Sequence, residues 1–238
     1  MTHPDIRAAL GRERLNTLLA DAEAARTARQ ARLYRRQGAT PARRGSPRRY
    51  RAGPGTRAVL RDGSAVVIRQ VHSSDALLLA DGFARLSAHS RRMRFLQPKD
   101  ELSQAELRYL TQVDHHDHEA LGALDDRTGR GVGIARYVRH ANDPERAEIA
   151  VTVVDAWQRR GLGTELLAQL ADRAHAEGVQ RFTVLVATDN AAVAGLLHSM
   201  RAHLISRNPG TAEYQISLSP GRGRAAAGNR GTEDKLRR

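Results

Sequence analysis

The stretch VTVVDAWQRRGLGT, residues 151–164, decides the fold of this chain. It begins within an apolar run, 149–154, that is typical of a buried strand, and it ends in a turn that contains Gly161 and Gly163. The residues that follow place apolar side chains at helical spacing: Leu166, Leu167, Leu170 and Ala174. A strand, a glycine-bearing turn and a helix predict a phosphate-binding loop, because the free N–H groups and the dipole at a helix N-terminus favour an anion.

The residues of this turn support the prediction. Gly161 and Gly163 let a ligand approach the backbone where a Cβ atom would clash, and Arg159 and Arg160 add positive charge. An ordinary strand-to-helix connection that uses the glycines only for packing is the competing interpretation. A dinucleotide-binding loop is disfavoured, because the pattern G-x-G-x-x-G continues from neither glycine.

Length and composition indicate one folded domain with extensions. The chain has 238 residues, of which 40% are hydrophobic and 4% aromatic, so its core must be mostly aliphatic. It contains no cysteine, which excludes disulfides, thiolate metal sites and a cysteine nucleophile. No apolar run approaches the ~18 residues of a membrane span, and the N-terminus lacks the residue order of a secretory signal. We therefore expect a soluble, cytoplasmic protein with no membrane partner.

The net charge of +13 is concentrated at the two ends of the chain. Residues 1–57 carry +10 and residues 220–238 carry +4, whereas the middle of the chain carries −1. Composition predicts a basic, partly helical arm at 1–36, a disordered linker at 37–56, a folded domain at 57–219 and a disordered basic tail at 220–238. Such ends predict at most weak, non-specific contact with nucleic acid.

The apolar pattern between the two ends predicts an α/β domain with a mixed sheet. Strands at 58–60 and 65–71 flank a hairpin signal, Ser74-Asp75 is expected to cap a helix, and Ser103 with Glu106 forms a capping box that opens another. The later elements are expected in this order: strands at 119–125, 131–139 and 145–154, a helix at 159–177, a strand at 179–187, a helix at 190–200, and strands at 203–206 and 212–218.

Gln158, Gly161 and Gly163 fit, in order, the pyrophosphate-loop signature of the GNAT superfamily of N-acetyltransferases. Four stretches, 61–69, 85–96, 110–124 and 147–167, resemble the acetyltransferase domain of bacterial Pat-type protein lysine acetyltransferases. The resemblance covers about 58–218 and implies a GNAT-like, mostly antiparallel mixed sheet flanked by helices. It also implies acetyl-CoA as co-substrate and a protein lysine as acceptor, for example on an acyl-CoA synthetase.

The resemblance also implies which residues bind acetyl-CoA. The backbone of Val153 and Val154 would hold the pantetheine, and Asn190 matches an asparagine that contacts the cofactor. Asn190 would serve equally well as the N-cap of the helix that follows it. The pyrophosphate would lie on the loop residues Gln158, Arg159, Arg160, Gly161, Leu162, Gly163 and Thr164.

Glu148 is the candidate general base. The acceptor ammonium must lose a proton before it attacks a thioester, and a nearby carboxylate can accept that proton. Glu148 is the only charged residue in the run 147–154, and the resemblance implies the catalytic role at this position. Alternatively, Glu148 is a strand residue that faces water or pairs with Arg136 or Arg146.

Several residues depart from the family pattern or invite other functions. Leu197 stands where many family members have a tyrosine that acts as general acid, and Ala202-His203 replaces a usual Gly-Phe pair, so the acid has no candidate.

The spacing of His115, His116 and His118 fits no zinc signature, and we expect no metal. Arg91, Arg92 and Arg94 either meet an acidic acceptor surface or form a solvated helix face.

Three functions follow from these observations. The first is an acetyltransferase that acts on protein lysine, and the second is the same enzyme with a small amine as acceptor. The third is a catalytically idle GNAT-fold module whose basic arms bind nucleic acid. Fold alone does not choose among them, because function depends on the site.

Overall fold

The computed structural model describes residues 55–218. The predictions made for the basic arm, for nearly all of the linker and for the basic tail lie outside the described residues. Within 55–218, no helix is both long enough and apolar enough to cross a membrane.

Eight strands and several helices alternate along the chain in nearly the predicted order. They are β1 (Thr56–Val59), β2 (Ala65–Gln70), η1 (Ser73–Asp75), α2 (Ala76–Ala84), α3 (Ala88–Phe95), α4 (Gln104–Thr111), β3 (His118–Asp125), β4 (Gly131–His140), β5 (Asp143–Val153), η2 (Asp155–Trp157), α5 (Leu162–Ala176), β6 (Arg181–Ala187), α6 (Ala191–Ser199), β7 (His203–Asn208) and β8 (Thr211–Ser217).

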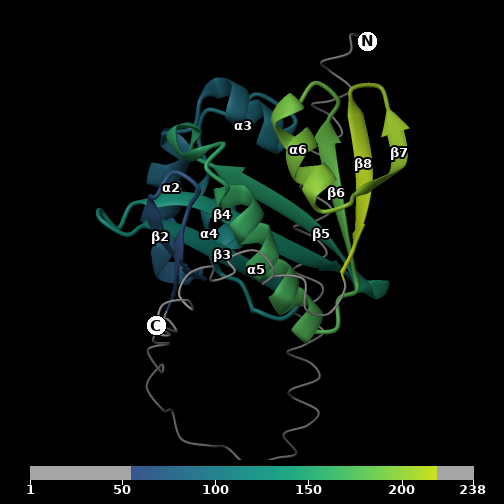
Figure 1. Cartoon of the computed structure of the whole chain (residues 1–238), viewed down its shortest axis with the longest axis horizontal. Helices are drawn as coiled ribbons and strands as arrows, with labels where there is room; N and C mark the ends of the chain where they lie inside the picture. Colours follow the sequence, from purple (N-terminus) through teal and green to yellow (C-terminus); the bar gives the residue numbers. More distant parts are fainter. Residues whose placement is uncertain (1–54, 219–238) are drawn as a thin grey trace, which may run out of the picture.

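All eight strands belong to one sheet with the order β1-β2-β3-β4-β5-β6-β8-β7. Every neighbouring pair is antiparallel except β5 and β6, which run parallel. Helix α5 covers one face of the sheet, and α2, α3 and α4 cover the other (Figure 1). The predicted mixed and mostly antiparallel sheet flanked by helices is therefore confirmed.

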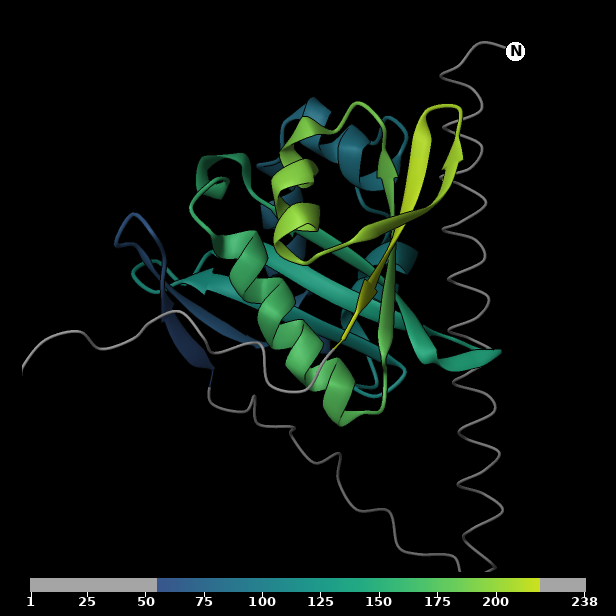
Figure 2. The same cartoon turned by 45° about the vertical axis from the view of Figure 1, so that its right-hand side comes forward.

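The parallel pair β5–β6 is short. Only Arg146–Glu148 pair with Arg181–Thr183, although β5 continues to Val153. The two strands meet near one end and diverge toward the other (Figure 2). Beyond Glu148, the edge of β5 that faces β6 is therefore open.

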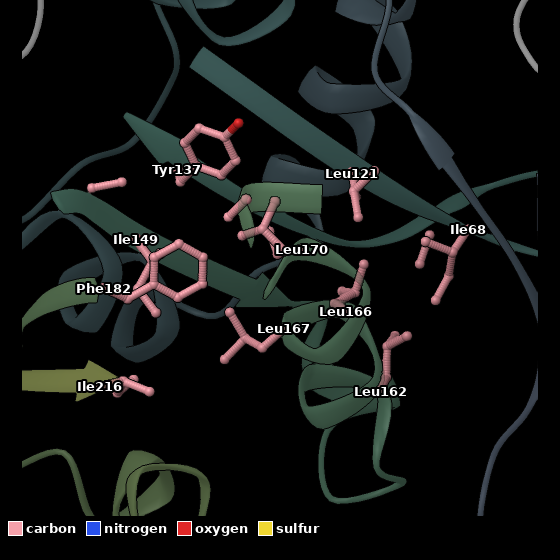
Figure 3. Close-up of a cluster of buried hydrophobic side chains, with 14 of the residues drawn as sticks. Ile68, Leu121, Tyr137, Ile149, Leu162, Leu166, Leu167, Leu170, Phe182 and Ile216 are labelled. Atoms are coloured by element: carbon pink, nitrogen blue, oxygen red, sulfur yellow. The ribbon is translucent and has the colours of Figure 1, made fainter. Parts of the chain in front are cut away.

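The main core lies between α5 and the sheet (Figure 3). The α5 leucines that point into this core are at most 2% exposed: Leu162, Leu166, Leu167 and Leu170. They meet aliphatic and aromatic side chains of the strands, among them Ile68, Tyr137, Ile149 and Phe182. Because side chains alternate along a strand, Ile149 of β5 faces α5 whereas Glu148 faces the side of α2, α3 and α4.

Some helix starts differ from the predictions. Asp75 occupies the N-cap position of α2, as predicted, but its side chain makes no capping bond to that helix. Ser74 and Asp75 lie in the short 3₁₀ turn η1, where the Asp75 carboxylate accepts the N–H of His72 at 2.8 Å. Helix α3, capped by Ser87, has no predicted boundaries, although a solvated helix face is one interpretation of its three arginines. The capping box of Ser103 and Glu106 is confirmed at α4. Helix α5 begins at Leu162, later than predicted, because the preceding backbone adopts positive φ values.

Candidate active site

The loop between β5 and α5 contains two residues in the left-handed conformation, and the second of them is the N-cap of α5. Arg159 has φ 61° and Gly161, the N-cap of α5, has φ 91°. The backbone N–H groups of the first helical turn lack intrahelical acceptors by construction, and the helix dipole adds positive potential there. A Cβ atom on Gly163 would have only ordinary contacts, the nearest at 3.9 Å from Val153, so the space above the turn is open.

The polar side chains of the loop stabilise the loop itself. Gln158 Nε2 donates to the Val153 carbonyl at 3.1 Å and to Ser90 Oγ at 3.2 Å. Arg160 forms an ion pair with Asp62 at 2.9 Å and lies over the Trp157 ring. Because these side chains are engaged within the protein, the loop offers an anion its backbone N–H groups first.

Only every second residue of β5 directs its backbone N–H and C=O groups toward the open edge. The Val154 N–H donates to the Val132 carbonyl at 3.0 Å, and the Val154 carbonyl accepts from the Trp157 N–H at 2.7 Å. Because backbone groups alternate in direction along a strand, Val151 and Val153 turn theirs toward β6. Of the two valines assigned to pantetheine from the sequence, Val153 keeps an N–H at the open edge, whereas both backbone groups of Val154 are engaged within the protein.

A cavity of about 130 Å³ occupies the divergence of β5 and β6, and we call it the transfer pocket. Its walls come from α3, α4, β4, β5, β6 and the start of α6. Its polar lining includes Arg94, Tyr109, Arg136, Glu148 and Asn190. The structure therefore brings the candidate base and the candidate cofactor asparagine into one cavity.

Glu148 shares this pocket with two arginines. Desolvation, followed by repulsion from Arg136, lowers the pKa of Arg94 to about 10, and Glu148 acts in the opposite direction. Desolvation also lowers the pKa of Arg136, again opposed by Glu148. Arg146, the other partner considered from the sequence, lies 3.5 Å from Asp143 instead. Glu148 is half-buried, so its carboxylate stands in a positively charged, partly dry environment.

Arg136 is buried, with 5% exposure. Its guanidinium stacks on the Tyr109 ring, 4.5 Å from the centroid, and one of its nitrogens contacts His118. Among residues 55–218, no hydrogen-bond partner reaches the other terminal nitrogen, Nη1. Sequence reasoning considered Arg136 only as a partner for Glu148 and missed Tyr109, since one tyrosine on an apolar helix face signals nothing by itself.

The three arginines of α3 have different surroundings, so they do not form one solvated face. Arg91 donates to the carbonyls of Ala84 and Asp100, both at 3.0 Å. Arg92, with a side chain that is 41% exposed, lies 3.5 Å from Asp189. Arg94 is half-buried and lines the transfer pocket.

Helix α6 offers no side chain in the place of the family tyrosine. Leu197 is buried in a small apolar cluster with Val186 and Ala212. His198 is exposed, and Ser199 Oγ donates to the Leu196 carbonyl at 2.8 Å. Asn190 occupies the N-cap position of α6 but makes no capping bond with its side chain, which remains in the pocket lining.

The histidines near the start of β3 bind protein groups. His115 Nδ1 lies 2.7 Å from Glu119 Oε1, His116 contacts Glu177, and His118 contacts Arg136. In the part of the chain that the structure describes, no three His, Cys, Asp or Glu side chains gather as metal ligands do.

The chain matches known proteins over this same region. The family model described as "Acetyltransferase (GNAT) family" matches residues 85–200. "Acetyltransferase PA5475" of Pseudomonas aeruginosa is 35% identical over 135 residues, which are 56% of this chain and 70% of that protein. "Acetyltransferase Pat" of Mycolicibacterium smegmatis is 30% identical over 161 residues, which are 68% of this chain and 48% of that protein. The chain thus spans about half the length of the M. smegmatis relative.

Solved structures give the same picture. The GNAT domain of S. lividans PAT superposes with a TM-score of 0.66 at 27% identity, over 69% of this chain and 97% of that domain. The cAMP-binding acyltransferase from Mycobacterium smegmatis superposes with a TM-score of 0.52 at 28% identity, over 71% of this chain and 48% of that protein.

Proposed function

Because this chain belongs to the acetyltransferase (GNAT) family, we propose that it transfers an acetyl group from acetyl-CoA to an amine, with a protein lysine as acceptor. The resemblance to Pat-type protein lysine acetyltransferases supports lysine as the acceptor, and an acyl-CoA synthetase is the first protein to test. We place the reaction in the cytoplasm, since a chain without cysteine suits a reducing compartment.

The observation that carries the proposal is the divergence of β5 from β6 directly at Glu148. It opens a strand edge and a pocket beside a carboxylate. An extended ligand arm could pair with the N–H groups of Val151 and Val153 while its reactive end lies near Glu148. An ordinary strand-to-helix connection needs neither feature.

The described residues fit acetyl-CoA. The N–H groups of the turn from Gly161 to Thr164 suit its pyrophosphate, with Arg159 exposed nearby. The open edge of β5 suits the pantetheine amides, and the Asn190 side chain is available at the pocket wall. The co-substrate supplies an activated thioester, and the protein supplies position, proton transfer and exclusion of water.

In the proposed reaction, Glu148 accepts a proton from the acceptor ammonium, directly or through a water. The amine nitrogen then forms a bond to the acyl carbon and gives up its second proton to solvent, the carbon–sulfur bond breaks, and CoA leaves as a thiolate that solvent protonates. Leu197 cannot protonate the sulfur, so the mechanism assigns no general acid to α6.

An acetyl-CoA turnover assay with three kinds of acceptor tests the proposal: lysine peptides, a whole acyl-CoA synthetase and polyamines. Transfer to lysine on the peptides or the synthetase is the expected result. Transfer to polyamines alone would replace the protein acceptor by a small amine. If the protein neither turns over nor binds acetyl-CoA but does bind DNA, the result would favour the catalytically idle module.

A further inference from the structure

A second cavity lies beside the transfer pocket, between the sheet and helices α2, α3 and α4. This inner cavity measures about 100 Å³. Its lining is almost entirely apolar and includes Leu79, Phe83 and Leu86 of α2. An engineered apolar cavity of about 150 Å³ binds benzene, so a space of this size suits a few carbon atoms.

The two cavities meet at a small set of shared residues: Arg94, Phe95, Leu110, Arg136 and Ala150. Arg94 and Arg136 are the charged members of this set. Both guanidiniums therefore stand at the junction between an apolar space and the pocket that contains Glu148.

The two guanidiniums are supported on their faces by aromatic rings. Arg94 lies 5.0 Å from the centroid of Phe95, and Arg136 lies 4.5 Å from that of Tyr109. A stacked guanidinium keeps the N–H donors on its edge available, and two parallel N–H groups match a carboxylate. The Nη1 of Arg136, buried and without a partner among residues 55–218, is such a donor.

The charge at this junction does not balance. Glu148 and Glu106 are the carboxylates in the lining of the transfer pocket. Glu106 already pairs with Lys99 at 2.7 Å, which leaves Glu148 opposite two arginines. One positive charge remains in a partly desolvated space, where a charge is costly unless an anion joins it.

We propose that Arg94 and Arg136 bind a carboxylate carried by one of the reacting substrates. The carboxylate belongs either to the far end of the acyl group on CoA or to the amine acceptor, and the inner cavity receives an apolar group attached beside it. This inference rests on the proposed acyl transfer and adds to it a preference for an acidic substrate. A purely structural role for both arginines would give no such preference.

Calorimetric titration with succinyl-CoA and butyryl-CoA tests whether the carboxylate is carried by the acyl group on CoA. These acyl groups have the same number of carbons and differ by a carboxylate in place of a methyl. If the acyl group carries the carboxylate, succinyl-CoA binds at least about tenfold more tightly, since charge-assisted hydrogen bonds exceed neutral ones.

Titration of L-leucine and L-leucinamide into protein saturated with CoA tests whether the carboxylate is carried by the amine acceptor. The pair differs only in the carboxylate, and the side chain suits the inner cavity. If the acceptor carries the carboxylate, leucine binds at least about tenfold more tightly than its amide.

Variants connect either preference to the two arginines. Arg94→Met and Arg136→Met keep apolar length without charge and should abolish the preference, whereas Arg92→Met, on the same helix but outside both cavities, should retain it. Equal affinities within both pairs, or a preference that survives in both variants, would overturn the subsite. Acetyl-CoA is titrated in parallel: its failure to bind contradicts the proposed function as well, whereas normal binding without a carboxylate preference contradicts only the subsite.

Discussion

Glu148 is the last residue of β5 that pairs with β6, so its side chain stands where the two strands part. We expect Glu148→Gln to lower turnover by roughly 10²- to 10⁴-fold, the usual cost of losing a general base. The loss should shrink at high pH, because more of the lysine amine, with an ordinary pKa of about 10.4, is then already deprotonated. Acetyl-CoA affinity should change little.

Glu145→Gln is the matched control for this experiment. Glu145 lies on the same strand, is exposed, and its carboxylate accepts from Gln180 away from the transfer pocket. Both variants are compared by initial rates over a pH series and by acetyl-CoA calorimetry. If Glu148→Gln turns over at the wild-type rate at neutral pH, Glu148 is not the general base and is only a residue of the strand.

Glu119 is fully buried, unlike the half-buried Glu148, and we expect its carboxylate to stabilise the fold. Burial alone would raise its pKa, but hydrogen bonds from His115 and Gln70, with the charge of Arg173, hold the pKa below the ordinary 4.5. A carboxylate with a lowered folded-state pKa stabilises the fold above its unfolded pKa and loses this contribution as pH falls through the folded value. The free energy of unfolding should therefore decrease as the pH falls below about 4.5.

Substitution separates Glu119 from other acid-sensitive groups. Glu119→Gln should cost roughly 1.5–3 kcal/mol at pH 7, since charged hydrogen bonds are lost, and should flatten the acid-dependent loss. Asp172→Asn, at an exposed position of α5, is the control with unchanged behaviour. Urea unfolding at pH 7 and in the acid range measures both, and an unaltered acid dependence in Glu119→Gln would assign the loss to other carboxylates.

At the scale of elements, the N-terminus of α5 gives the next prediction. Gly163→Asp should abolish acetyl-CoA binding, because the carboxylate occupies the place of a phosphate. The fold should survive, since an acidic residue in the first turn of a helix is favourable and a Cβ atom at this position has ordinary contacts. Gly163→Ala adds the Cβ atom without the charge, and any clash of that Cβ atom with acetyl-CoA should cost far less affinity than the carboxylate.

Calorimetry with acetyl-CoA and thermal unfolding measure these two variants. Retained affinity in Gly163→Asp would move the pyrophosphate away from this turn. Equal losses in both variants would point to crowding at Gly163 rather than to the charge.

Local sequence signals predicted the elements that depend on neighbouring residues. Gly63 in the first hairpin, the capping box at Ser103 and the helical spacing of the α5 leucines each specify structure within a few residues. The boundaries of helix α3 could not be predicted, because its eight residues bury no side chain completely and therefore lack a strong apolar period. The sequence does not distinguish Arg94 from Arg91 and Arg92, and only the packing of α3 against the sheet places it in the same pocket as Glu148.

At the scale of the whole molecule, the unequal distribution of charge separates two functions. Because the positive charge lies in 1–57 and 220–238, any DNA binding should be non-specific and should weaken steeply with added salt. A chain trimmed to 57–219 should lose that binding and keep acetyl-CoA binding. Fluorescence anisotropy with labelled duplex DNA over a salt series measures this, and undiminished binding by the trimmed chain would refute the division.

The divergence of β5 and β6 also leaves the backbone of β5 beyond Glu148 without a neighbouring strand from the described chain on that side. Among residues 55–218, the ladder between the strands β1 to β5 and the group β6, β8 and β7 has three residue pairs, and the Gln180 N–H donates to the Glu145 carbonyl at 2.7 Å beside them. A pantetheine chain in this gap would act as a substitute strand and shield amides that now face solvent or the pocket. Hydrogen–deuterium exchange should then slow at Val151 and Val153 when acetyl-CoA is added, but not at Val154, whose N–H already bonds to Val132. Bound acetyl-CoA would thus complete the backbone pairing of the sheet, and this pairing would be lost when CoA leaves and would form again when the next acetyl-CoA binds.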